Sequence, residues 1–282
     1  MGPPQWENRS YPSYPSYLSR AITFIAQNLS WRTRPMDGNT QVMDSSRYDD
    51  AYVKALFDRM GRTYDVMNVV SSFGFSEFWR WQCVANVPIQ KGQQVCDMMA
   101  GTGECWRYLR WRGAAMVTAV DFSHYMAERQ RARRVKTKAG AGDSMDVAVL
   151  EENATATSLA DASMDHVVCA FGLKTLNPAA LEGFAREIHR ILKPGGHFSL
   201  LEISLPESWI MGRLYQWYIS VGIPFIGKVW LGDIDCYRML GEYTQAFGSC
   251  ESVVGVFREA GLEAEVKRHF FGCATSLMGR KV

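Results

Sequence analysis

Two apolar runs, each ending in an acid, and a glycine turn after the first constrain the fold of this chain most. The first lies in segment 95–104, VCDMMAGTGE, and the second in segment 120–123, VDFS, which places Asp121 24 residues after Asp97. A strand, a loop, a helix and a second strand fit this spacing, and loop glycines let the backbone approach a ligand closely. The second acid then lies where a ribose diol needs a hydrogen-bond acceptor. The pattern predicts a nucleoside-binding α/β unit.

The alternation of apolar strands and helices continues along the chain from residue 93. Strands are expected at 93–99, 115–121, 146–150, 165–171 and 197–203, with helices at 103–112, 123–138 and 178–192. The sequence KPGG at 193–196 is a strong helix stop. After a helix at 251–260, the runs 262–270 and 272–280 predict an antiparallel hairpin at the sheet edge. The fold class expected is therefore α/β, a doubly wound Rossmann-like parallel sheet with a C-terminal antiparallel hairpin.

Two segments lie outside this alternation. Residues 1–45 begin with the repeat YPSYPSY at 11–17 and continue with apolar residues at helical spacing, so we expect an N-terminal helical lid on a domain at 46–282. Residues 204–250 follow the fifth strand and predict a helical cap. Six aromatic residues gather there: Trp209, Tyr215, Trp217, Tyr218, Phe225 and Trp230. An apolar acceptor pocket, a membrane surface and a second subunit, as in a homo-oligomer, are the alternative partners of these rings.

Composition excludes several classes of protein. The net charge of +2 does not indicate a nucleic-acid partner, and 47% hydrophobic residues suffice for a full core. Seven cysteines without a CxxC pair, and five histidines without HExxH, predict buried thiols in a reducing compartment and no metal site. The most apolar region is broken by charges and proline, and no secretory signal is recognised, so the cytoplasm is the expected location.

The glycine turn distinguishes among nucleotide ligands. A phosphate-binding P-loop would need GxxxxGKS or GxxxxGKT, which the chain lacks. A dinucleotide fold needs a third glycine at position 106, where Trp106 would obstruct close packing of helix on strand. S-adenosylmethionine (SAM) has no phosphate and needs a close turn for its methionine part and an acid for its ribose. Asp97 to Gly103 together with Asp121 therefore predict SAM as the cofactor.

Several further segments make the chain resemble the class I SAM-dependent methyltransferases, and among them the ubiquinone/menaquinone biosynthesis C-methyltransferase family. The segments are YDVMN at 64–68, SFG at 72–74 with Trp79, AGTGE at 100–104, VDFS at 120–123, Asn153-Ala154, FGL at 171–173, LKPGG at 192–196 and Leu201-Glu202. The resemblance covers about residue 48 to the C-terminus. It implies methyl transfer from SAM, most simply to carbon, of an apolar or aromatic small molecule.

The cofactor-binding residues expected from this pattern come from five places in the chain. They are Asp97, Gly101, Thr102 and Gly103 in the loop; Asp121, Phe122 and Ser123 after the second strand; Phe171 and Gly172 after the fourth; and, by resemblance, Asn153 and Ala154 beside the adenine and Tyr64 and Met67 as a cover. Ser123 is alternatively a helix cap, and Asn153 a loop residue that bonds its own backbone.

The substrate side departs from the family pattern. Glu104 stands where an aspartate is common, and Lys174-Thr175 replaces an Arg-Asn pair proposed to support deprotonation of a quinol. Glu104 and Lys174 are therefore the candidate catalytic bases, Lys174 only if its pKa is depressed. These changes favour a specialised metabolite or quinone-like acceptor over ubiquinone itself. Two alternatives remain: use of the sulfonium for cyclisation or aminocarboxypropyl transfer, and a non-catalytic binding protein with the same fold.

Overall fold

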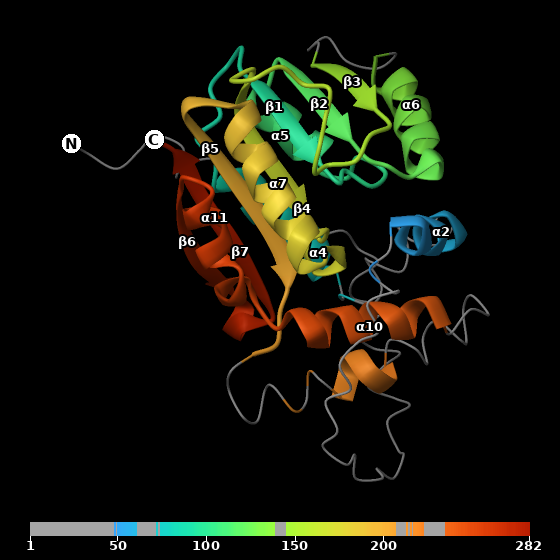
Figure 1. The fold of residues 1–282 in the computed structure, drawn as a ribbon. Coiled ribbons are helices and arrows are strands. Elements are labelled where there is room, and N and C mark those ends of the chain that lie inside the picture. Colours follow the sequence, from blue (N-terminus) through green and yellow to red (C-terminus); the bar gives the residue numbers. More distant parts are fainter. Residues whose placement is uncertain are drawn as a thin grey trace.

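A seven-stranded mixed sheet organises the chain (Figure 1), with the strand order β3-β2-β1-β4-β5-β7-β6. The computed structural model describes residues 48, 50–60, 72, 74–138, 145–206, 213, 215, 217–222 and 235–282. The predicted lid at 1–45 lies outside these residues. Strands β1 to β5 pair in parallel, and β6 and β7 add an antiparallel hairpin beside β5. The predicted α/β fold is confirmed, including the hairpin.

The strands lie within a few residues of their expected positions. They are β1 Gln94–Met98, β2 Met116–Val120, β3 Asp146–Leu150, β4 Met164–Ala170, β5 Leu192–Ile203, β6 Leu262–His269 and β7 Ala274–Lys281. Four of the five residues of β1 and of β2 are fully buried. Burial on both faces explains why these strands read as continuous apolar runs instead of alternating ones.

Helices cover both faces of the sheet and divide the core into two clusters. The helices are α2 Asp50–Met60, α4 Phe75–Ala85, α5 Trp106–Arg112, α6 His124–Lys138, α7 Pro178–Ile191, α10 Asp235–Phe247 and α11 Val254–Glu259. Phe184 of α7 and Phe257 of α11 pack on one face, whereas Trp79 of α4 and Trp106 of α5 pack on the other. Six of the cysteines are described, and all six are buried free thiols, as expected.

Strand β5 begins earlier than the sequence suggests. Helix α7 ends at Ile191 as expected, but the chain turns directly into extended backbone at Leu192, which pairs with Met164. The KPGG sequence then forms an irregularity in the ladder, where Gly195 has a φ of 76°. The glycines therefore end the helix without ending the strand, because they permit a local bulge.

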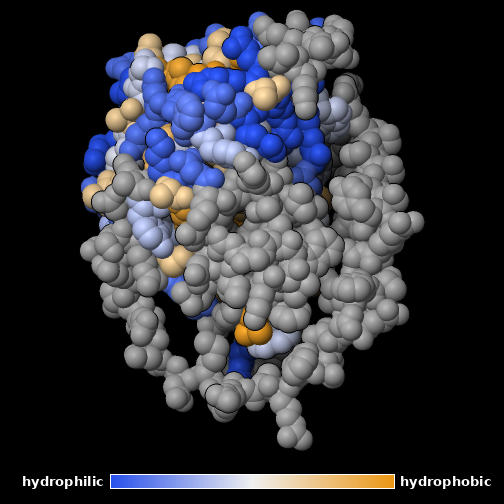
Figure 2. All heavy atoms as spheres, turned by 90° about the vertical axis from the view of Figure 1, so that its right-hand side faces the viewer, coloured by the Kyte–Doolittle hydropathy of each residue, from blue (hydrophilic) through white to orange (hydrophobic). Residues whose placement is uncertain are grey.

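The carboxyl ends of the parallel strands converge at one edge of the sheet, where α10 and α2 also lie (Figure 1). Helix α10 contacts the 3-10 turn Leu173–Thr175 that follows β4, and α2 contacts α6. Figure 2 shows hydrophilic side chains over the upper part of this side of the molecule, where α6 lies. Within the described residues, no helix is long and apolar enough to cross a membrane.

Buried histidines at the sheet predict loss of stability in acid. His166 is 3% exposed and bonds Gln93 Oε1 through Nε2 at 2.9 Å; burial, with His197 and Arg112 nearby, lowers its pKa to about 4, although Asp165 acts in the opposite direction. The unfolded chain binds this proton near pH 6.5, so folded stability falls as pH drops from about 6.5 to 4, by on the order of 2 kcal/mol.

The substitution His166→Gln keeps a donor toward Gln93 and removes this titration. Unfolding in urea at pH 7 and pH 4.5 should show a smaller acid loss in the variant than in the parent chain. His124, whose side chain is 65% exposed, supplies the control His124→Gln, which should leave the acid loss unchanged. An unchanged acid loss in His166→Gln would contradict this account.

Candidate active site

A cavity lies at the carboxyl ends of β1, β2 and β4, where the strand order reverses between β1 and β4. Open α/β sheets bind ligands at this point. The cavity holds about 490 Å³ of free space, some of it open to solvent. Twelve residues line it: Arg80, Met99, Ala100, Gly101, Glu104, Asp121, Phe122, Met126, Ala170, Phe171, Gly172 and Thr175.

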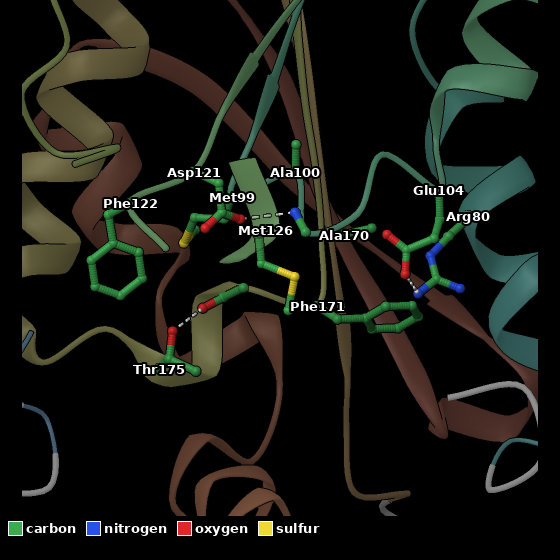
Figure 3. A pocket seen from close by; sticks show the side chains of 12 residues that line it. Arg80, Met99, Ala100, Glu104, Asp121, Phe122, Met126, Ala170, Phe171 and Thr175 are labelled. Carbon is green, nitrogen blue, oxygen red and sulfur yellow. Dashed lines mark hydrogen bonds and ion pairs between the residues drawn. The ribbon is translucent and has the colours of Figure 1, made fainter. Parts of the chain in front are cut away.

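Asp121 ties the end of β2 to the glycine loop after β1. Its Oδ2 accepts the Gly101 N–H at 2.8 Å, and its Oδ1 accepts the Ser123 N–H at 3.0 Å (Figure 3). Burial raises the pKa of Asp121 to about 7, while these two bonds act in the opposite direction. A carboxylate oxygen accepts more than one hydrogen bond, so the group retains capacity for a ligand diol.

The predicted glycine loop has the geometry that its sequence requires. Gly101 and Gly103 have φ values of 54° and 82°, in the left-handed region that favours glycine. A Cβ on Gly103 would lie 2.5 Å from the ring of Trp106, which is buried against the loop. Trp106 therefore fills the space beside Gly103, where a dinucleotide fold would have glycine and a close helix.

Helix α6 holds the same loop from the other side. Gln130 donates to the Gly101 carbonyl at 2.7 Å, and Arg133 donates to the Thr102 carbonyl at 2.7 Å. Ser123 caps this helix, since its Oγ accepts the Met126 N–H at 3.3 Å. The alternative of Ser123 as a helix cap is thus confirmed, while Thr102, predicted to bind cofactor, is buried and lies outside the cavity lining.

Asp97 lies beneath the loop and carries unusual electrostatics. It is 1% exposed, and burial together with the nearby Glu104 and Asp121 carboxyls raises its pKa well above the ordinary value, although Arg80 acts in the opposite direction. Its Oδ2 has no hydrogen-bond partner among the described residues. A buried acceptor of this kind is rare and marks a place for an ordered water or a ligand group.

The ends of β1 and β4 approach each other closely through two residues in left-handed backbone. Met99 has a φ of 50° and Phe171 a φ of 70°, both uncommon for residues other than glycine. A Cβ on Gly172 would lie 2.7 Å from the Met99 methyl carbon. Such strain persists where the surrounding structure holds it, and functional sites are common places for it.

Arg80 is a cavity residue that the sequence interpretation missed. It comes from α4, is 3% exposed, and pairs with Glu77 at 3.0 Å and Glu104 at 3.3 Å. Its guanidinium lies 4.9 Å from the centre of the Phe171 ring. The available signal was a single arginine within the aromatic sequence FWRW at 78–81, for which a substrate wall had been an alternative to core packing.

The two predicted bases lie in different surroundings. Glu104 lines the cavity beside Arg80. Lys174 does not line it: its Nζ donates to Glu202 Oε1 at 2.7 Å and to the Phe171 carbonyl at 2.9 Å, behind the cavity wall. Because Glu202 is fully buried and also accepts the Lys174 N–H at 3.1 Å, the pair fastens the turn after β4 to the end of β5.

The remaining predicted residues divide between the site and other places. Phe122, Phe171 and Gly172 line the cavity as expected. Asn153 Oδ1 accepts the Thr155 N–H at 3.0 Å, the loop bond considered as its alternative role, and Ala154 packs into the core.

Other predicted residues lie in the uncertain parts of the chain. Tyr64, Met67, Trp209, Phe225 and Trp230 lie outside the described residues. In the predicted cap, Tyr215 packs against the core cluster that contains Trp106, and Trp217 is 37% exposed. Contact of these aromatic residues with a membrane or a second subunit stays a prediction.

The chemistry of the cavity suits SAM. Asp121 offers a carboxylate to a diol, Gly101 has no Cβ to block the approach of a ligand to the loop, and Met99, Met126 and Phe171 supply apolar walls. The Oδ2 atom of Asp97 is the buried acceptor that lacks a partner.

Comparison with known proteins gives the same result. The model of the ubiE/COQ5 methyltransferase family matches residues 45–281. The demethylmenaquinone methyltransferase of Lactiplantibacillus plantarum is 30% identical over 81% of this chain and 95% of its own length. The enzyme of the same name from Geobacillus kaustophilus is 31% identical over 81% of this chain and 96% of its own length.

Solved structures share the fold at lower identity. A SAM-dependent methyltransferase from Thermotoga maritima superposes with a TM-score of 0.55 at 20% identity, covering 81% of this chain and 99% of its own. Phosphoethanolamine N-methyltransferase 2 of Haemonchus contortus, with S-adenosylhomocysteine (SAH) bound, gives 0.53 at 14% identity, covering 81% and 59%. With the family match over most of its length and a cavity suited to SAM, the chain is a SAM-dependent methyltransferase and belongs to the ubiE/COQ5 methyltransferase family.

Proposed function

We propose that this enzyme transfers the methyl group of SAM to a ring carbon of an apolar, quinol-like acceptor. The observation that carries the proposal is one cavity in which the polar cofactor elements, Asp121 and the Gly101 loop, share walls with Met99, Met126 and Phe171. The relatives named demethylmenaquinone methyltransferase support an acceptor of the quinone-precursor class. A specialised aromatic metabolite is the narrower alternative, which the Lys174-Thr175 departure keeps open.

The cofactor orientation in this proposal follows from the described residues. Asp121 holds the ribose diol, and the backbone at Gly101 borders the methionine part. SAM supplies a methyl group on a positively charged sulfur, which is already activated for displacement. The task of the protein is then to hold the acceptor carbon in line and to exclude competing water, and positioning of this kind accounts for much of the rate of such reactions.

Both candidate bases are ion-paired, which favours catalysis by positioning. An ammonium 2.7 Å from a buried carboxylate keeps its proton, so Lys174 does not accept one from the acceptor. We propose that Lys174 is a positioning residue, which holds the turn carrying Phe171 and Thr175 through Glu202. Thr175 lines the cavity, and its Oγ1 donates to the Gly172 carbonyl at 2.8 Å, which fixes the same turn.

The reaction type is tested with SAM labelled in its methyl group with carbon-13. We expect a demethylated naphthoquinol acceptor to gain a labelled methyl on a ring carbon, seen by NMR, with SAH as the second product by mass spectrometry. Methylthioadenosine as the product would instead indicate aminocarboxypropyl transfer or cyclisation. Binding of SAH without turnover of a panel of quinols and phenols would indicate a binding protein.

The pH dependence of SAH binding tests the role of Asp121. Because burial raises its pKa to about 7 and a ligand diol bonds the charged carboxylate best, affinity should rise about tenfold between pH 6 and pH 8. Calorimetry in buffers of different ionisation enthalpy should show proton release at pH 6.5. Asp121→Asn should bind more weakly and lose this pH dependence; an unchanged slope in the variant would remove Asp121 from the role.

The positioning role of Lys174 predicts two separate effects. Lys174→Met leaves the Glu202 carboxylate buried without a cation and should lower the free energy of unfolding by about 3–5 kcal/mol, measured in urea. Lys174→Met combined with Glu202→Gln should recover most of this stability and transfer methyl within about tenfold of the parent rate. A folded double variant that is 100-fold slower or worse would show that Lys174 acts in the chemistry.

A further inference from the structure

The Arg80–Glu104 pair places opposite charges side by side in the cavity wall. Arg80 belongs to α4 and is 3% exposed, and the Glu104 side chain, directly after the glycine loop, is 13% exposed. The two are 3.3 Å apart, longer than the roughly 2.7–2.9 Å of a strong charge-assisted bond. A buried guanidinium is costly to retain, so its place beside a ligand cavity calls for a functional reason.

The cavity has two chemically different ends. Figure 3 shows Asp121 and Phe122 toward one side and Arg80, Glu104 and Phe171 toward the other, with the loop residue Ala100 between them. When Asp121 holds the ribose, the part of the cofactor beyond the ribose extends past the loop toward Arg80. That part of SAM ends in an amino acid, which carries one carboxylate and one ammonium.

We infer that Arg80 and Glu104 bind the amino-acid end of the cofactor, Arg80 its carboxylate and Glu104 its ammonium. A guanidinium matches a carboxylate in geometry and charge, and a carboxylate bonds an ammonium strongly. The absence of a Cβ at Gly101, whose Cβ would lie 3.2 Å from Glu104 Oε2, leaves this carboxylate next to the loop backbone. The inference rests on the proposed placement of the ribose at Asp121.

This assignment changes the role of Glu104. In the unliganded protein Arg80 and Glu104 neutralise each other, and a bound zwitterion supplies each with a partner of the opposite sign. The nearby Asp97 feels both charges: Glu104 raises its pKa and Arg80 lowers it. Glu104 is then a cofactor-binding residue, and the base predicted from the sequence is not required at this position.

Two ligands separate the ends of the cavity in a binding experiment. SAH carries the amino acid, whereas 5′-methylthioadenosine has the same adenosine and sulfur without it. Arg80→Gln should weaken SAH about 10- to 100-fold, measured by calorimetry, and leave methylthioadenosine within about twofold. Equal weakening of both ligands in a folded variant would overturn the inference, because it would show that Arg80 acts only on the fold of the cavity.

Decarboxylated SAH separates the two members of the pair. This ligand keeps the ammonium, so its affinity should be insensitive to Arg80→Gln and still fall about tenfold or more in Glu104→Gln. Should Arg80→Gln not fold, Arg80→Lys keeps the charge and should retain part of the preference for SAH over the decarboxylated ligand. The same loss of both ligands in Arg80→Lys, or no effect of Glu104→Gln on either, would also overturn the inference.

Arg107 supplies a matched control. It pairs with Glu77, as Arg80 does, but its side chain is 58% exposed and does not line the cavity. Arg107→Gln should leave both affinities unchanged. Near-ultraviolet circular dichroism checks that each variant is folded. Failure of the parent protein to bind SAH would contradict the proposed function, whereas tight SAH binding with no preference over methylthioadenosine would contradict this inference alone.

Discussion

The hydrogen bond from the Gly101 N–H to Asp121 Oδ2 is the interaction on which the rest of the site depends. It joins the loop after β1 to the end of β2 at 2.8 Å and fixes the backbone that a cofactor must approach. The Ser123 N–H holds the other carboxylate oxygen, so a buried charge is positioned by backbone alone. Burial opposes that charge and the two N–H groups support it, which keeps the group near its titration point.

Two ion pairs of the same chemical type have different roles because of where they lie. Lys174–Glu202 is enclosed, with side-chain exposures of 5% and 0%, and it fastens two strand ends together. Arg80–Glu104 borders the cavity, where a ligand can compete for each partner. Buried pairs add little net stability over apolar residues, so their value here lies in fixing one arrangement of the strand ends.

Local sequence patterns predicted the strands, the glycine loop and the two acids, because each depends on neighbouring residues. The pairing that decides the roles of Glu104 and Lys174 was not predictable in this way. Arg80 lies 24 residues before Glu104, and Glu202 lies 28 residues after Lys174, so neither partner belongs to the motif that drew attention to the base. Likewise, β5 begins at Leu192 because pairing with Met164 outweighs the local stop signal.

Gly172 is needed for space and not for backbone freedom. Its φ of −102° is open to any residue, but a Cβ there would lie within 3.0 Å of three atoms of the Met99 side chain. A larger residue at 172 therefore requires a smaller one at 99. Both positions border the cavity, so they are expected to change together during evolution, and a shift in acceptor size between relatives should appear as a paired replacement at these two sites.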